Sequence, residues 1–240
     1  MPPVPLRDVL AAPPVRPAIS QREPTTTVPT LASADPAPWP RGVGCVTAEQ
    51  CPTEVQTAVV QTLLALGNRQ SPVILAGRVG VGKSTVAALV ARSFAAWSWF
   101  ACDDLLTTLM DCRQHGSVQR WDAQGYAVHT TEQQMLRRLE QIGILVLDDV
   151  GTRQLSEAQT EALRAVLDCR VRKPLLVTTN CTSEQLQASV GARNTSRLLA
   201  GAVVKIAGSD RRREMALTPP KSAPGSSPKM GGTDRHEQHT

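Results

Sequence analysis

The chain has 240 residues, a formal net charge of +5 and an isoelectric point near 9.1. This length accommodates one ordinary domain with tails, and the mildly basic balance permits contact with nucleic acid without requiring it. No apolar run approaches the length that spans a bilayer, and prolines interrupt the N-terminus where a signal sequence needs an apolar stretch. We therefore expect a soluble, cytoplasmic protein without a membrane partner. Its six cysteines lack zinc-ligand spacing and are expected to be free thiols.

Both ends of the chain have compositions that do not support a packed core. Eleven prolines fall within the first 40 residues, and proline removes backbone donors and prevents sustained helix. Residues 218–240 are rich in Pro, Gly, Ser and Lys. We expect a disordered leader over residues 1–44, one folded domain over residues 45–217 and a disordered tail over residues 218–240.

The first strong pattern inside this domain is a phosphate-binding loop. A helix predicted over residues 52–66 leads to an apolar strand, Val73–Ala76, which is followed by Gly-x-x-x-x-Gly-Lys-Ser and a second helix. Glycines let backbone N–H groups turn towards a triphosphate, and the N-terminus of the next helix favours the same anion. Lys83 is expected to reach the β- and γ-phosphates, and the hydroxyl of Ser84 to bind Mg²⁺. The predicted nucleotide-binding residues are Gly77, Arg78, Val79, Gly80, Val81, Gly82, Lys83, Ser84 and Thr85.

Beyond the loop, helices alternate with short apolar strands. The predicted helices cover residues 85–96, 103–112, 131–141 and 157–171, and residues 114–129 are expected to be polar and irregular. The predicted strands cover residues 97–101, 144–147, 175–179 and 203–206. Strands that are apolar on both faces and alternate with helices indicate a parallel sheet covered on both sides. The expected fold is a three-layer α/β domain.

Polar side chains follow two of these strands. Asp148 and Asp149 end the apolar run from Ile144, and Asn180 follows the strand over residues 175–179. In open α/β sheets ligands bind at the carboxyl ends of the strands. Asp148 is suited to hold Mg²⁺ beside Ser84, and Asp149 to orient and deprotonate an attacking water. The amide of Asn180 is suited to hydrogen-bond the γ-phosphate or that water.

These motifs, in this order, resemble the AAA+ ATPases. The segments Phe100-Ala-Cys-Asp-Asp-Leu-Leu, Leu147-Asp-Asp-Val-Gly and Arg193-Asn-Thr-Ser-Arg-Leu-Leu narrow the resemblance to the DnaC/DnaI-type helicase loaders and the IstB-type transposition ATPases, over roughly residues 50–210. The resemblance implies a P-loop NTPase fold of the AAA+ type. It also implies that Asn180 is the first sensor residue and that Arg197 is an arginine finger. Arg193 is the alternative finger. A finger of this kind acts on the ATP of a neighbouring subunit, so the working unit is expected to be a homo-oligomer.

The chain also departs from this family. Only residues 208–217 separate the last predicted strand from the tail, so a full helical lid domain does not fit. Arg211, Arg212 and Arg213 are candidates for the charge such a lid supplies, for DNA contact, or for a solvated cluster. A proline-rich leader stands where loaders often carry a helicase-binding domain, which puts docking on a helicase in doubt.

The predicted function is that of an ATP-binding and ATP-hydrolysing DNA-replication accessory protein. A DnaC-like loader that acts on single-stranded DNA and places a replicative helicase is the first expectation, with ATP and Mg²⁺ as cofactors. An IstB-like helper ATPase that recruits a transposase is the alternative. A small-molecule kinase is less favoured, because the two-acid strand followed by Thr-Asn indicates hydrolysis by an activated water.

Overall fold

The computed structural model describes residues 46–121 and 127–210. The expected leader and tail, Cys45 and the three arginines at 211–213 lie outside the described residues. Cys102, Cys169 and Cys181 are free thiols, and burial raises the pKa of Cys102 to about 12. No helix in the described part of the chain is long and apolar enough to cross a membrane.

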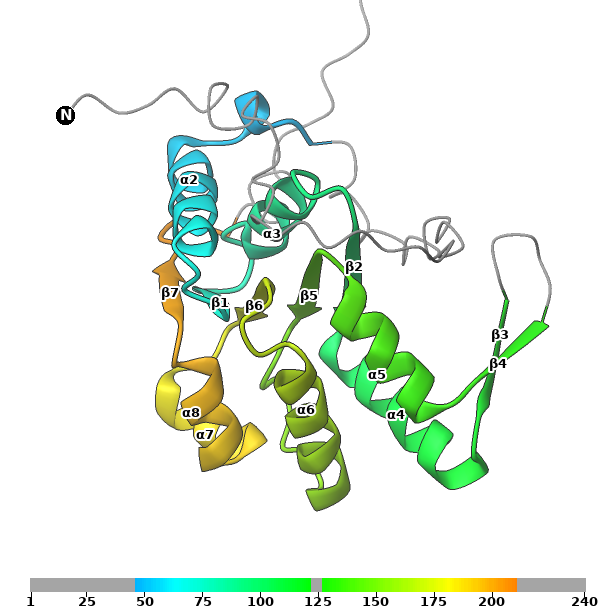
Figure 1. Cartoon of the computed structure of the whole chain (residues 1–240). Helices are drawn as coiled ribbons and strands as arrows, with labels where there is room; N and C mark the ends of the chain where they lie inside the picture. The colour runs from blue at the N-terminus through cyan, green and yellow to red at the C-terminus, as the bar shows by residue number, and fades with distance from the viewer. Residues whose placement is uncertain (1–45, 122–126, 211–240) are drawn as a thin grey trace, which may run out of the picture.

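A five-stranded parallel sheet forms the centre of the fold (Figure 1). Its strands are β1 (Val73–Ala76), β2 (Trp97–Ala101), β5 (Ile144–Asp148), β6 (Leu175–Thr179) and β7 (Ala202–Lys205). Their order across the sheet is β2-β5-β6-β1-β7, and every neighbouring pair is parallel. Because β6 lies between β1 and β5, the carboxyl end of β6 lies between the start of the phosphate loop after β1 and Asp148 at the end of β5.

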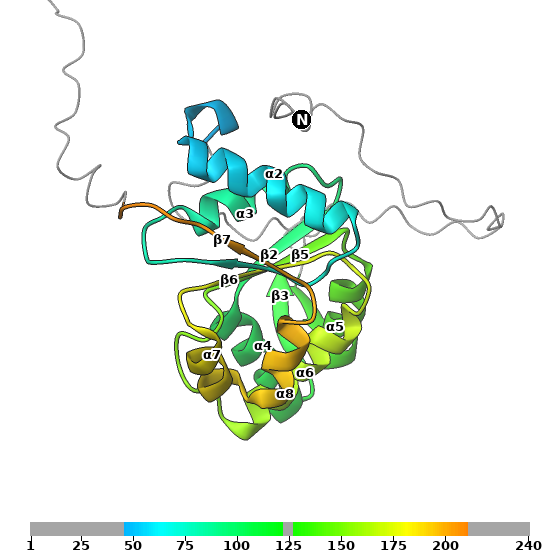
Figure 2. The ribbon, with the colours of Figure 1, turned by 90° about the vertical axis from the view of Figure 1, so that its left-hand side faces the viewer.

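Helices cover both faces of the sheet, as the strand pattern predicts (Figure 2). One face carries α2 (Thr53–Gly67) and α3 (Lys83–Ala91). In the described part of the chain, the other face carries five helices: α4 (Cys102–His115), α5 (Glu132–Gln141), α6 (Glu157–Cys169), α7 (Ser183–Val190) and α8 (Ala192–Leu198). The three-layer architecture with a central parallel sheet is therefore confirmed.

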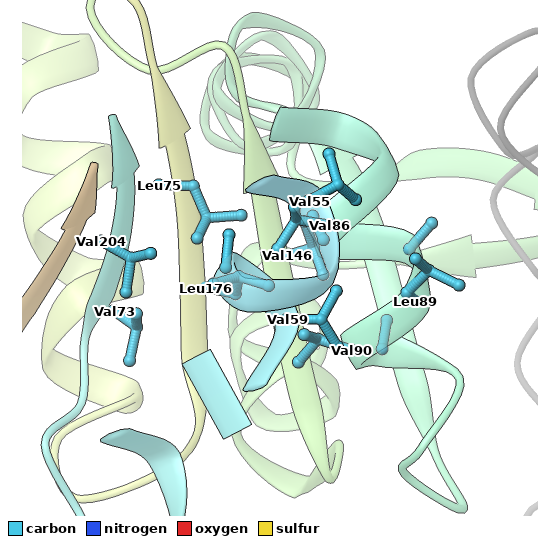
Figure 3. Packing of buried hydrophobic residues seen from close by; sticks show 14 of the residues in the cluster. Val55, Val59, Val73, Leu75, Val86, Leu89, Val90, Val146, Leu176 and Val204 are labelled. Carbon is cyan, nitrogen blue, oxygen red and sulfur yellow. The ribbon is translucent and has the colours of Figure 1, made fainter. Parts of the chain in front are cut away.

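The core beneath α2 and α3 follows from helical and strand periodicity. Buried residues of α2 recur at three- or four-residue spacing, and alternate side chains of each strand point to the same face. The labelled side chains of this cluster in Figure 3 are Val55, Val59, Val73, Leu75, Val86, Leu89, Val90, Val146, Leu176 and Val204. Burial of each such Val or Leu contributes about 2 kcal/mol relative to exposure. A second cluster fills the space between the opposite face of the sheet and α4 to α8.

Arg170 joins the starts of β5 and β6, at the end of the sheet that lies away from the phosphate loop. Its side chain is 2% exposed, and its guanidinium donates to the carbonyl oxygens of five residues. These acceptors end α5, lead into β5 and lead into β6; they are Leu139, Glu140, Ile142, Gly143 and Pro174. Burial lowers the pKa of Arg170 to about 10, which leaves it charged near neutral pH. One side chain thus joins three elements.

The structure corrects the prediction for residues 114–129. A two-stranded antiparallel hairpin, β3 (Val118–Trp121) and β4 (Ala127–Thr130), stands where an irregular segment was expected. Figure 1 shows it projecting from the ends of α4 and α5. Each short strand is stabilised by pairing with the other, which a polar composition does not reveal.

Three smaller features also differ from expectation. A 3-10 turn at Ala48–Gln50 and the helix α7 were not predicted. The helix α3 ends at Ala91 instead of residue 96. There the N–H groups of Ser93 and Phe94 bond to carbonyls three positions back, which tightens and ends the helix.

Candidate nucleotide and metal site

The phosphate loop has the backbone geometry that its glycines predict. Gly80 and Gly82 have φ angles of 81° and 100°, in the left-handed region that glycine adopts without steric cost. Gly82 is the N-cap of α3, and no side chain caps this helix. Side chains do cap α5, α6 and α7. The first turn of α3 therefore presents its backbone N–H groups to the loop, as an anion site requires.

The chain that follows β7 lies directly against this loop. The N–H of Ile206 donates to the carbonyl of Ala76 at 2.8 Å, and a Cβ atom at Gly77 would lie 2.5 Å from the carbonyl oxygen of Ile206. A Cβ atom at Gly80 would lie 1.9 Å from a carboxylate oxygen of Asp210. The backbone of Ile206 thus requires glycine at position 77, whereas the φ angle of 81° favours glycine at position 80.

Lys83 connects the loop to the end of β6. The side chain is buried, and its ammonium donates to the carbonyl oxygens of Gly77, at 2.9 Å, and Arg78, at 2.8 Å. It also donates to Oδ1 of Asn180, 97 positions away. The two residues predicted to contact the terminal phosphate are therefore adjacent, and the carbonyl contacts offset the cost of burying the ammonium.

Ser84 and Asp148 form the candidate metal site. The Ser84 hydroxyl lies 3.3 and 3.4 Å from the two carboxylate oxygens of Asp148. Burial raises the pKa of Asp148, while hydrogen bonds from Thr178 and Ser84 and the charge of Lys83 oppose that shift. A divalent cation would offset the free-energy cost of burying the charge of this carboxylate. The hydroxyl and carboxylate oxygens are ligands that Mg²⁺ prefers.

Ser84 and Asp148 supply oxygen atoms from two side chains to the candidate metal site. Within residues 46–121 and 127–210, no group of three or more His, Cys, Asp or Glu side chains could hold a metal. Mg²⁺ usually binds through one or two protein oxygens and completes its shell with phosphates and water. The residues present therefore fit an Mg²⁺ ion bound together with a nucleotide.

Asp149 occupies the outer side of the same edge. It is exposed and has a φ angle of 57°, an uncommon conformation for a residue with a side chain. Its N–H donates to the hydroxyl of Thr178 at 2.9 Å. Sequence reasoning missed Thr178, although a buried Thr-Thr-Asn sequence at the end of an apolar strand was the signal that could have indicated it.

Comparison with known proteins places this geometry in a family. The chain matches the IstB-like ATP binding protein family over residues 50–205, which is more than half of its length. The chain belongs to the IstB-like ATP-binding proteins. A search of curated proteins finds no match.

Solved structures share the fold of this IstB-like protein. The DnaC helicase loader is 19% identical with a TM-score of 0.53, and the match covers 65% of this chain and 92% of that one. DnaI is 18% identical with a TM-score of 0.54, over 70% of this chain and 94% of that one. AMPPCP-bound DnaA from Aquifex aeolicus is 19% identical with a TM-score of 0.54, over 70% of this chain and 51% of DnaA. These matches confirm the AAA+ type of P-loop fold.

Arg197 of the IstB-like chain lies on α8, in the layer opposite α3 (Figure 2). Its guanidinium forms a 2.5 Å ion pair with Asp168 of α6, and both side chains are partly exposed. Arg193 is exposed on the same helix. The structure brings Lys83, Ser84, Asp148, Asp149 and Asn180 to one edge, but it pairs Arg197 with α6 instead of the phosphate loop.

A cavity opens beside Asn180 in this IstB-like domain. Its volume is about 410 Å³. It is lined by Gly151, Thr152, Asn180, Cys181, Gln185 and Ser189. The carboxyl ends of β5 and β6 and the start of α7 thus leave open space next to the predicted sensor.

Proposed function

We propose that this IstB-like chain is a Mg²⁺-dependent ATPase that works as a nucleotide-controlled switch on DNA. The observation that carries the proposal is the convergence at one sheet edge of two contacts, Lys83 with Asn180 and Ser84 with Asp148. The exposed acid Asp149 stands at the same edge. ATP hydrolysis needs a phosphate-binding loop, a metal site and a general base, and candidates for all three lie at this edge of the sheet.

Each residue has a distinct chemical role in the proposed reaction. Lys83 neutralises phosphate charge, and Ser84 with Asp148 holds the metal. Mg²⁺ supplies, when bound, further charge neutralisation on the β- and γ-phosphates. Asp149 accepts the proton of the attacking water, and Asn180 orients that water or the γ-phosphate through an uncharged amide.

The proposed DNA partner is single-stranded, and the first proposed protein partner is a replicative helicase. The support is the likeness of fold to the DnaC helicase loader and to DnaI. A DnaA structure bound to AMPPCP and single-stranded DNA shares this fold as well. Transposition is the second candidate, because the chain matches the IstB-like family. The resemblance to IstB-type transposition ATPases implies a transposase as the protein partner.

We also propose that the working unit is a homo-oligomer in which Arg197 completes the site of a neighbour. A guanidinium opposite the γ-phosphate stabilises charge in the transition state. The isolated chain should consequently hydrolyse ATP slowly, and assembly on DNA should accelerate it.

Steady-state hydrolysis of ATP by the purified full chain tests the proposal. Phosphate release is measured with Mg²⁺ or with EDTA, and with or without single-stranded DNA. We expect release that needs Mg²⁺, rises with DNA and disappears in Lys83→Ala. Absence of Mg²⁺-dependent hydrolysis under every condition, including added single-stranded DNA, would refute the ATPase assignment.

A second experiment decides between the two protein partners. The Asp149→Asn variant is held in ATP, used as bait in its native host, and the recovered proteins are identified by mass spectrometry. A hexameric helicase would support the loader, and a transposase would move the protein to the transposition class. Lys83→Ala as bait is the matched control, because it should not hold ATP.

A further inference from the structure

Thr178 has a buried hydroxyl that contacts Asp148, the last residue of β5, and Asp149, which follows it. Its side chain is 0% exposed in a strand whose preceding residues are Leu175, Leu176 and Val177. A hydroxyl at such a position is unfavourable unless it is hydrogen-bonded. Here Oγ1 donates to Oδ1 of Asp148 and accepts from the N–H of Asp149. One hydroxyl therefore contacts both acidic residues directly.

The backbone of Thr178 fixes the same turn from the other side. Its carbonyl accepts from the N–H of Val150 at 2.9 Å. Asp149 lies between these two contacts, with a φ angle of 57°. A residue with a side chain pays about 1–2 kcal/mol for this left-handed conformation, so the surrounding bonds must hold it. With the backbone held in this way, the side chain of Asp148 is buried and Asp149 is exposed.

We propose that Thr178 is a positioning residue for ATP hydrolysis: its hydroxyl orients the metal-binding carboxylate of Asp148 and fixes the backbone that carries Asp149. This inference rests on the proposed function. Thr178 acts through the two acids and not on ATP itself. Partners that orient a metal ligand commonly contribute about 10- to 100-fold to metal affinity or activity.

The adjacent Thr179 offers a matched control. It is 2% exposed on the same strand. Its hydroxyl donates to the carbonyl of Val150 at 2.7 Å and accepts from the N–H of Cys181 at 3.1 Å. Thr179 therefore hydrogen-bonds two backbone groups, the carbonyl of Val150 and the N–H of Cys181, and its hydroxyl contacts neither carboxylate. A purely structural role would make the two threonines equivalent.

The test compares Thr178→Val, Thr178→Ser and Thr179→Val in the full chain. Three quantities are measured: kcat for ATP, the Mg²⁺ concentration at half-maximal rate, and the affinity for Mn²⁺ with AMPPCP by electron paramagnetic resonance. We expect Thr178→Val to lower kcat and to weaken Mn²⁺ affinity, each by about 10-fold or more. Thr178→Ser keeps the hydroxyl and should restore both to within about threefold, and Thr179→Val should change neither beyond that factor.

Two outcomes would overturn the inference. The first is a Thr178→Val variant whose kcat and Mn²⁺ affinity match the wild type, and the second is an equal loss in Thr179→Val. If Thr178→Val does not fold, Thr178→Ala is compared with Thr178→Ser by the same three measurements. Failure of the wild-type chain to hydrolyse ATP refutes the proposed function instead, so the two failures are distinguishable.

Discussion

The hydroxyl oxygen of Ser84 lies almost equally far from the two carboxylate oxygens of Asp148, at 3.3 and 3.4 Å, although the residues are 64 positions apart. Ser84 is the second residue of α3, and Asp148 is the last residue of β5. Their juxtaposition follows from the parallel sheet, because the carboxyl ends of its strands meet at one edge. The metal position is thus a property of the topology and not of a local motif.

Stability should depend on pH through Asp148. Burial raises the pKa of this carboxyl above its ordinary value of about 4, so between the two pKa values the folded chain binds the extra proton. The free energy of unfolding in EDTA should therefore fall as pH rises through that window. Asp148→Asn cannot ionise and should lack this contribution, as urea unfolding at several pH values can show. Identical pH slopes for the two proteins would contradict it.

Lys83→Ala should weaken ATP binding strongly. A hydrogen bond to a charged group contributes about 1.5–3 kcal/mol, which corresponds to roughly 10- to 150-fold in the dissociation constant. Titration with a fluorescent ATP analogue measures this loss. Arg137→Ala is the matched control, because it also removes one cationic side chain, exposed on α5 and outside the predicted nucleotide-binding residues. Equal losses in both variants would argue against the specific role of the ammonium.

Asp149→Asn should bind ATP and hydrolyse it about 10²- to 10⁴-fold more slowly, the range that a general base contributes. Asparagine suits this position, since it tolerates the left-handed backbone and keeps the N–H that bonds to Thr178. Binding by fluorescence and turnover by phosphate release separate the two effects. Wild-type turnover in this variant would remove Asp149 as the base.

Arg197→Ala and Asp168→Ala should differ sharply in turnover. Each breaks the same half-exposed ion pair, which stabilises the fold by at most about 1 kcal/mol. Only Arg197→Ala removes the proposed finger, so only that variant should lose turnover with DNA, by about 10³-fold. Equal turnover in the two variants would reduce Arg197 to a surface ion pair.

Mixing variants tests whether the finger acts in trans. Subunits with Lys83→Ala cannot use ATP but still carry Arg197, whereas subunits with Arg197→Ala keep an intact nucleotide site. A mixed oligomer should therefore recover part of the turnover that each variant lacks alone. Arg193→Ala in the same assay examines the alternative finger.

Arg170→Met should destabilise the fold by about 3 kcal/mol or more, because it leaves several buried carbonyl groups without their donor. Urea unfolding measures the loss. Arg137→Met, an exposed position on α5, is the control and should change stability by less than about 0.5 kcal/mol. A loss below 1 kcal/mol for Arg170→Met would show that water replaces the guanidinium.

The sequence could predict which side chains meet at the candidate site, because its signals are local. The glycine spacing before Lys83 and the acids after an apolar strand each specify a position on one element. The contact between Lys83 and Asn180 then follows once the strands are parallel, even though 97 positions separate the residues.

Long-range side-chain partners could not be predicted in this way. Arg170 reads as a surface residue at the end of a helix, and only the folded chain shows that it meets carbonyls from three elements. The hairpin was missed because neither of its strands is apolar enough to be recognised without the other. The helix α7 had a readable signal, the capping box from Thr182 to Gln185, which sequence reasoning overlooked.

The hydrogen bonds of Arg170 also make the two ends of the sheet different from each other. The approaches to β5 and β6 are tied together by one guanidinium, whereas the carboxyl ends of the same strands terminate in Asp149 and Asn180, both exposed. When two strands are held together at one end, their free ends have more room to move relative to each other. If the chain works as the proposed switch, a change of nucleotide should move the carboxyl ends of β5 and β6 more than the ends that Arg170 joins.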